Sequence, residues 1–279
     1  MKNSDCVKFL KTTLPELQLR WPGFRRVQRQ VCRRLKKRLK ELGLTNFENY
    51  RSYLFQHPDE WSIVDSCCRI TISRFYRDRE VFAQLSDILP RLVKLKSTSK
   101  NSTINCWSIG CASGEEVYTL KLIEHFCLSS SLNSLDILAT DLDRNMLSRA
   151  KLGCYQIGSL KELPLEWIDR AFFVELAPSN KDKTIFDYQY YLKPIFKEKI
   201  TWKQQDIRKQ MPNRSFDLIL CRNLAFTYFA PILQEQIQKN LLARLVSEGI
   251  LVIGQKESLP NKEVNQLIEL SSLGIYQKL

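Results

Sequence analysis

The chain has 279 residues, of which 44% are hydrophobic and 26% are charged. Its 43 Lys and Arg against 30 Asp and Glu leave a formal net charge of +13. These proportions are typical of a globular protein, and the length suits one large domain plus a smaller one. No apolar stretch is long enough to span a bilayer, and the first residues lack the apolar block of a signal peptide. We therefore expect a cytoplasmic protein without membrane insertion.

The cysteine and histidine content argues against a metal centre. The nine cysteines are scattered, include the vicinal pair Cys67–Cys68 and form no C-x-x-C element. This spacing favours reduced core thiols over a disulfide framework or a zinc site. His57 and His125 are the only histidines, which disfavours a Ser/His/Asp triad. Any chemistry here must use little imidazole, and we expect no metal.

Residues 1–95 are expected to form a helical N-terminal domain with one strongly basic helix at about 25–40. Apolar residues recur at intervals of three or four, as in an amphipathic helix: Phe24, Val27, Val31, Leu35 and Leu39. Between Leu19 and Lys40 there is no acid, and the basic residues are Arg20, Arg25, Arg26, Arg29, Arg33, Arg34, Lys36, Lys37, Arg38 and Lys40. This face is either merely solvated or a docking surface for an acidic partner, which could be a nucleic acid or a protein.

Helical signals continue beyond the basic helix, which should stop at Gly43. The stretch "TNFE" at Thr45–Glu48 has the capping-box pattern that starts a helix, and "PDEWSIVDSCC" predicts another. A polar stretch without large side chains follows, and residues 96–103 are expected to link this domain to a second one.

Residues 104–279 alternate between strand-like and helix-like stretches. The strands are "INCWSIG", "LDILATD", "FDLILCRN" and "GILVIG", and a helical pattern separates each from the next. Such alternation predicts an α/β fold, a parallel sheet with helices on both faces.

The loop after the first predicted strand suits a ligand without phosphate. A dinucleotide site would read G-x-G-x-x-G, whereas Gly110 to Gly114 read G-C-A-S-G, and Glu115 and Glu116 then open the helix. Carboxylates at a helix N-terminus interact favourably with the helix dipole, but they repel phosphate. S-adenosylmethionine (SAM) fits, with Asp141 at the end of the second strand placed to accept from ribose hydroxyls. The alternative is that the two glutamates merely start a helix and Asp141 merely caps one.

Five blocks together resemble the CheR family of SAM-dependent protein-glutamate O-methyltransferases: "RITISRFYRDREVF", "WSIGCASGEEVYTL", "ILATDLDRNMLSRAKLGCY", "FDLILCRNLAFTYF" and "GILVIGQKESL". The resemblance implies a small helical domain and a Rossmann-like methyltransferase domain with a β-subdomain inserted at about 170–200. It also implies S-adenosylhomocysteine as product and a role in chemotaxis.

The resemblance also implies a set of site residues. Arg77 and Tyr228 would be catalytic, and the cofactor-binding positions would be Thr71, Ser73, Arg77, Gly110, Glu116, Asp141, Asp206, Ile207, Cys221, Arg222 and Asn223. "CRNLAFTYF" departs from the family by one extra residue before Tyr228, and "GQKESL" replaces a histidine-containing element. Methyl transfer to a carboxylate needs no general base, because the acceptor is already ionised at neutral pH. A cation that aligns it, such as Arg77, would suffice.

An acidic protein, such as a chemoreceptor-like cytoplasmic domain, is the expected substrate. It would dock through the basic helix 25–40 of a monomeric enzyme. Two alternatives stay open. One is a nucleic-acid methyltransferase, although the fourth strand end reads "LCRNLAF" rather than an N-P-P-Y-like or P-C element. The other is a SAM-binding sensor without turnover.

Overall fold

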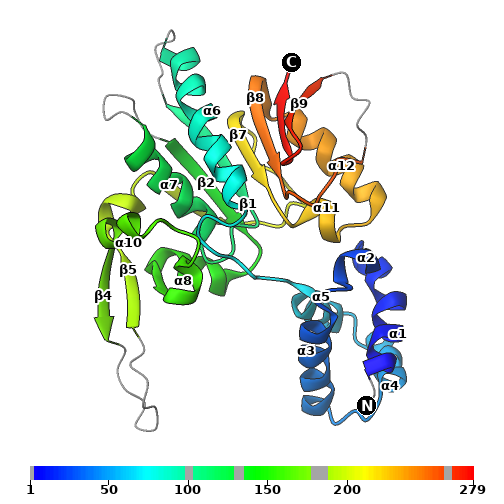
Figure 1. Ribbon diagram of the computed structural model, residues 1–279. Helices are drawn as coiled ribbons and strands as arrows, with labels where there is room; N and C mark the ends of the chain where they lie inside the picture. Colours follow the sequence, from blue (N-terminus) through cyan, green and yellow to red (C-terminus); the bar gives the residue numbers. More distant parts are fainter. Residues whose placement is uncertain (1–2, 98–102, 129–134, 177–187, 261–265) are drawn as a thin grey trace. The chain divides into compact units, whose positions relative to one another are not determined.

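A computed structural model of the protein describes residues 3–97, 103–128, 135–176, 188–260 and 266–279. These residues form two compact units. The helical unit comprises Met1–Ile70 and Asn223–Gln236, and the sheet unit comprises Thr71–Arg222 and Ile237–Leu279 (Figure 1). Across the described part of the chain, none of the helices combines the length and apolarity that crossing a membrane requires.

The helical unit is built from short helices, as expected for the N-terminal region. Its elements are α1 (Asn3–Thr13), the 3₁₀ turn η1 (Leu14–Leu17), α2 (Trp21–Phe24), α3 (Gln28–Glu41), α4 (Phe47–Gln56), α5 (Glu60–Cys68), α11 (Ala225–Tyr228) and the first half of α12 (Pro231–Leu242). Helix α4 starts one residue later than the capping-box pattern predicts, because the side chain of Asn46 accepts from the Asn49 amide at 2.8 Å.

Helix α3 is the basic helix. Val31, Leu35 and Leu39 lie on one face and are buried, as the periodicity predicts. The helix begins at Gln28 rather than at residue 25, so Arg25 and Arg26 belong to the preceding turn. The basic helix is therefore shorter than expected.

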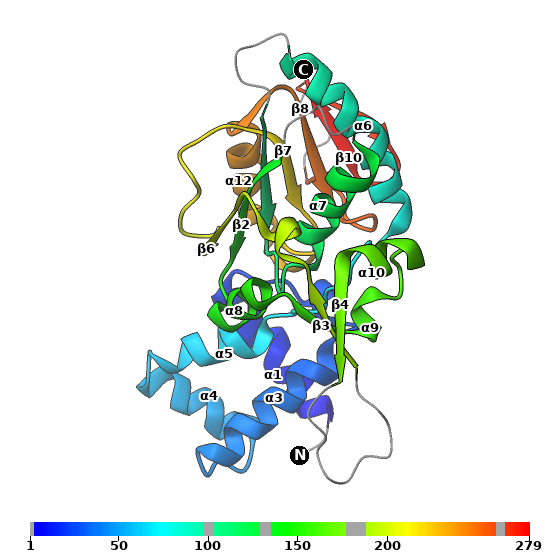
Figure 2. The same ribbon diagram turned by 90° about the vertical axis from the view of Figure 1, so that its left-hand side faces the viewer.

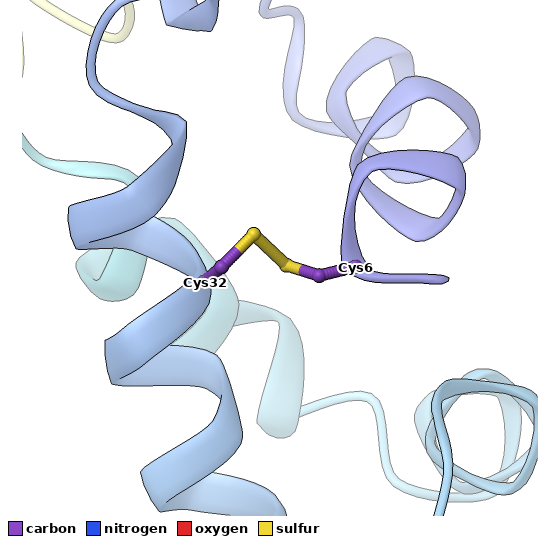
Figure 3. Close-up of a disulfide and its surroundings, with 2 residues drawn as sticks. All are labelled: Cys6 and Cys32. Carbon is purple, nitrogen blue, oxygen red and sulfur yellow. A yellow bond between two sulfur atoms is a disulfide. The ribbon is translucent and has the colours of Figure 1, made fainter. Parts of the chain in front are cut away.

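A disulfide joins α1 to α3, which corrects the expectation that the cysteines are reduced core thiols. Cys6 and Cys32 are both buried, and a bond links their sulfurs (Figure 3). The spacing of 26 residues carries no recognisable motif, and only the packing of the two helices brings the sulfurs together. The other cysteines form no disulfide: Cys67, Cys68, Cys106, Cys111, Cys127, Cys154 and Cys221.

The segment Asn223–Gln236 packs against the N-terminal helices. Arg20 donates from its side chain to the carbonyls of Phe226 and Thr227, and its amide donates to Tyr228 at 2.8 Å. A Cβ on Gly23 would lie 2.3 Å from the Thr227 carbonyl oxygen, so this close approach requires glycine. A segment from the C-terminal half of the chain is therefore part of the N-terminal helical unit.

The sheet unit has the Rossmann-like architecture that the alternation predicts. Its strands run in the order β6-β2-β1-β7-β8-β10-β9, parallel except that β10 is antiparallel to both neighbours. They are β1 (Ile104–Ile109), β2 (Leu135–Asp141), β6 (Ile200–Gln204), β7 (Phe216–Cys221), β8 (Leu245–Ile253), β9 (Leu267–Ser271) and β10 (Ile275–Lys278). The chain builds outward from β1 through β2 to β6 and then crosses to β7, so the topological switch point lies between β1 and β7.

Helices α6 (Arg79–Ser97) and α7 (Glu115–Cys127) lie on the same face of this sheet (Figure 2). Their buried apolar residues form one core with alternate strand residues, among them Ile104 and Cys106 of β1 and Leu218 and Leu220 of β7. Helix α8 (Arg144–Leu152) follows β2.

The boundary between the two units differs from the expected domain boundary, because α6 packs with the sheet unit. The expected division places 1–95 in one domain and the linker at 96–103, whereas the units divide between Ile70 and Thr71. The reason is that Val81, Phe82 and Leu85 bury the apolar face of α6 against the strands. Residues 98–102 of the expected linker lie outside the described residues.

A small antiparallel sheet is inserted between β2 and β6, as the resemblance implies. Its order is β3-β5-β4, from β3 (Cys154–Gln156), β4 (Phe172–Leu176) and β5 (Tyr188–Leu192). Around it lie α9 (Ile157–Leu160), α10 (Leu165–Ala171) and η2 (Pro194–Lys197). Residues 177–187 of the expected insertion at 170–200 lie outside the described residues.

Candidate functional site

The carboxyl edge of the parallel strands gathers most of the candidate residues. Gly110 follows β1, Asp141 ends β2, Asp206 and Ile207 follow β6, and Cys221 ends β7. Open α/β sheets bind ligands at this edge, beside the switch point. These residues are distant in sequence, but the register of the strands brings them to one edge.

The loop between β1 and α7 is tightly turned. Gly110, Ala112 and Gly114 all have positive φ, of 67°, 47° and 90°. A Cβ on Gly114 would lie 3.0 Å from both the Ala150 Cβ and the Trp202 ring, so glycine is required by conformation and by space. The G-C-A-S-G pattern therefore shapes a turn that presents its backbone at the strand edge.

Asp141 braces this turn from the neighbouring strand. Its Oδ2 accepts from the Ala112 amide and its Oδ1 from the Asp143 amide, each at 2.8 Å. Asp143, rather than Asp141, caps α8, because its carboxylate accepts from the Asn145 amide. The interpretation of Asp141 as a helix cap is therefore wrong.

The two consecutive glutamates of α7 have different environments. Glu115 is buried and accepts from the Ser113 hydroxyl at 2.9 Å. Burial raises its pKa, and hydrogen bonds with Ser113 and Ser73 partly oppose the increase. Glu116 instead accepts from Ser108 of β1 at 2.8 Å and from Arg222 at 3.1 Å. Both glutamates therefore have side-chain contacts beyond their position at the start of the helix.

Arg222 follows β7 and is the main buried cation of this edge, with a side chain only 3% exposed. Its Nη2 donates to the Asp78 carboxylate at 2.7 Å and to the Arg77 carbonyl at 2.9 Å, while its Nη1 donates to Glu116. The guanidinium also lies 4.9 Å from the centre of the Phe82 ring. Burial of an arginine requires this degree of pairing.

The segment that begins at Thr71 runs beside α7. Thr71 and Ser73 are half-buried, and Ser73 bonds to Glu115. The guanidinium of Arg77 donates to the Ile72 carbonyl at 2.9 Å. Among the described residues Arg77 forms no ion pair, and neighbouring Asp78 instead binds Arg222.

Asp206, Ile207 and Cys221 line the same strand edge. Asp206 pairs with Arg208 at 2.9 Å, and Ile207 presents an apolar side chain that is 7% exposed. Cys221 is fully buried at the end of β7. Asn223 and Tyr228 belong to the helical unit, where the Tyr228 ring lies 5.0 Å from that of Phe24.

These features fit SAM. The loop offers backbone in a glycine-dependent turn, Asp141 and Glu116 offer carboxylates for hydroxyl and ammonium donors, and Ile207 offers an apolar surface for an adenine ring. The edge holds no glycine-rich phosphate cradle, and its carboxylates would repel a pyrophosphate. The donor set therefore suits a cationic nucleoside without phosphate.

The sequence of most of the sheet unit matches one family. Residues 71–273 match the family model for the CheR methyltransferase SAM binding domain, and residues 28–64 match that for the CheR methyltransferase all-alpha domain. The chain belongs to the CheR methyltransferase family. It is accordingly a SAM-dependent methyltransferase, and the CheR match begins at Thr71, where the sheet unit begins.

Curated relatives in the CheR family span most of the chain. The chemotaxis protein methyltransferase of Borreliella burgdorferi is 28% identical over 233 residues, which cover 81% of this chain and 78% of the relative. That of Listeria monocytogenes is 31% identical and covers 70% of this chain and 68% of its own. That of Escherichia coli is 26% identical, with 84% and 77% covered.

Sequence reasoning missed several residues of this CheR-family site. Thr119 accepts from the Tyr76 amide at 2.9 Å, and Tyr155 of β3 donates to the Ser113 carbonyl at 2.7 Å. Asp78 binds Arg222. Thr119 lies in the middle of an apolar helix and Tyr155 in a short strand, so neither has a local signal. Only their contacts identify them.

Proposed function

We propose that this chain transfers the methyl group of SAM to the side-chain carboxylate of a glutamate in an acidic protein. Carboxylates on neighbouring elements, Glu116 and Asp141, suit the cofactor, while the nearby segment 71–78 carries the Arg77 guanidinium. The observation that carries the proposal is that this cation has no carboxylate partner among the described residues. An unpaired guanidinium is suited to a carboxylate from outside the chain.

The residues present match the chemistry of this transfer. SAM supplies an activated methyl group, and the glutamate carboxylate is ionised at neutral pH, so no general base is required. Arg77 would hold the carboxylate in a fixed geometry, and alignment can supply roughly 7 to 11 kcal/mol in favourable cases. We also assign the eleven cofactor-binding positions and Tyr228 to this site as part of the proposal.

The outward face of α3 is the proposed docking surface for the acidic substrate. Arg29, Arg33, Lys37 and Lys40 recur three or four residues apart and are exposed. We call these four residues the basic face. Arg34 and Arg38 do not belong to it. Arg34 donates to the carbonyls of Cys67 and Arg69, and Arg38 pairs with Glu60 at 2.7 Å.

The relatives named chemotaxis protein methyltransferases suggest the kind of substrate. An acidic cytoplasmic domain of a chemoreceptor would complement the basic face, and long-range attraction would speed the encounter.

The experiment is to incubate the purified protein with methyl-labelled SAM and chemoreceptor fragments, then treat the product with mild base. We expect label that base releases as methanol, because methyl esters hydrolyse where methylated amines and bases do not. Base-stable label on nucleic acid would favour a nucleic-acid methyltransferase. Tight SAM binding with no transfer to any acceptor would favour a sensor and overturn the proposal.

A further inference from the structure

The backbone on either side of Arg77 is strained. Tyr76 has a φ of 55° and Asp78 a φ of 63°, so two residues with side chains occupy the left-handed region. Residues other than glycine adopt it rarely, and such strain persists only where surrounding contacts enforce it. Arg77 lies between them, so its position depends on whatever holds its neighbours.

Thr119 of α7 holds the first neighbour. Its hydroxyl accepts from the Tyr76 amide at 2.9 Å and donates to the Glu115 carbonyl at 2.7 Å. The Thr119 side chain is fully buried, and Phe75 beside it is also buried, with its amide donating to Ser159 at 3.0 Å. The hydroxyl therefore has one fixed orientation in which it can accept from Tyr76.

Arg222 and Asp78 hold the second neighbour. The buried Arg222 guanidinium binds both the Arg77 carbonyl and the Asp78 carboxylate, so it fixes the peptide bond between them. The Asp78 carbonyl accepts from the Val81 amide at 2.9 Å, which ties the segment to the start of α6. Each end of the strained stretch thus has a buried polar anchor.

The side chain of Arg77 contributes little to its own placement. Its single described hydrogen bond is to the Ile72 carbonyl within the same segment. We infer that Asp78 and Thr119 are positioning residues that hold Arg77 in a strained backbone and so aim its guanidinium at the acceptor carboxylate. The inference rests on the proposed function, in which Arg77 binds that carboxylate.

If Asp78 only stabilised the fold, its substitution would affect kcat in a different way. Removal of one partner of a buried ion pair usually destabilises a protein, because the other charge loses its partner, but this effect does not depend on Arg77. If Asp78 acts through Arg77, its loss should matter only while Arg77 is present. In Asp78→Ala, Arg222 keeps its hydrogen bond to Glu116, so the loss of kcat should exceed any loss of SAM affinity.

The test compares Asp78→Ala and Thr119→Val with the wild type in three measurements: kcat for methyl transfer, SAM affinity by calorimetry, and hydrogen exchange of the Tyr76 amide. In both variants we expect kcat to fall about tenfold, SAM affinity to fall by less than kcat does, and exchange of the Tyr76 amide to rise about tenfold. Thr119→Ser keeps the acceptor and should restore kcat. Glu162→Gln is the matched control, because it removes only the charge that pairs with Arg74, a half-exposed residue of the same segment as Arg77.

A double-mutant cycle with Arg77→Ala supplies the decisive comparison. Asp78→Ala should cause no further loss of kcat in the Arg77→Ala background, because the residue that it positions is absent. Three results would each overturn the inference. The first is a double variant whose loss of kcat equals the product of the two single losses. The others are a wild-type kcat in Asp78→Ala and an unchanged exchange rate of the Tyr76 amide. If the wild type methylates no protein carboxylate, the proposed function fails, and exchange at Tyr76 still decides whether the two residues hold this backbone.

Discussion

Arg222 donates a 2.7 Å hydrogen bond to Asp78 although 144 residues separate them in the sequence. Because the same guanidinium also binds Glu116, one buried cation joins the end of β7, the start of α7 and the segment that carries Arg77. This relationship fixes the segment that carries Arg77 beside the strand edge where SAM is expected.

Asp141→Ala should weaken SAM binding by about tenfold or more. A lost charge-assisted hydrogen bond typically costs about 1.5 to 3 kcal/mol, and the Ala112 amide would also lose its acceptor. Calorimetry with SAM measures the effect. Asp136→Ala is the matched control, since Asp136 lies on the same strand but pairs with half-exposed Arg214. Equal affinities in the wild type and Asp141→Ala would remove Asp141 from the site.

Arg77→Ala should lower the single-turnover rate of methyl transfer by about two orders of magnitude with SAM saturating, as for loss of a transition-state donor. Arg77→Lys should restore the rate only in part, because lysine keeps the charge but lacks the planar fork. Arg74→Ala is the control, since Arg74 is half-exposed and pairs with Glu162 in the same segment. Near wild-type rates in both Arg77 variants would show that another cation holds the acceptor.

Reversal of the basic face should impair transfer to a protein substrate. We expect replacement of Arg29, Arg33 and Lys37 by glutamate to lower kcat/KM for that substrate at least tenfold at low salt and to leave SAM affinity unchanged. The wild-type kcat/KM should fall as salt rises.

The charge-matched control for this triple variant replaces Lys151, Lys161 and Lys239, which are exposed on other elements. Similar losses in the two triple variants would mean that net charge matters and α3 does not. Arg34 is left intact in both, because it supports the end of α5.

Reduction of the Cys6–Cys32 disulfide should destabilise the helical unit. Closing a loop of 26 residues restricts the unfolded chain, and the chain-entropy relation gives about 3 to 4 kcal/mol. The measurement is the urea midpoint of the helical circular-dichroism signal with and without dithiothreitol. The Cys6→Ser, Cys32→Ser double variant should show the reduced midpoint in both conditions. A wild-type midpoint insensitive to reductant would mean that the bond adds no stability.

Much of the sheet unit could be predicted from the sequence because its signals are local. Alternating strand and helix patterns identify β1, α7, β2, α8, β7, α12 and β8, and Gly110 and Asp141 end two of the predicted strands. Parallel strands place their carboxyl ends on one edge, so the candidate cofactor site follows from the order of elements. The short strands β3, β6, β9 and β10 have no such pattern and were not predicted.

What the sequence determined by itself is therefore the class of fold, the family and the strand edge that carries the candidate residues. The tertiary structure decided which side chains meet. It assigned α6 to the sheet, turned Arg34 inward, paired Cys6 with Cys32 and bound Asp78 to Arg222. Periodicity and capping report contacts within a few residues, whereas these pairings depend on burial and loop closure over long separations. For this reason the residues that hold Arg77 become visible only when the chain is folded.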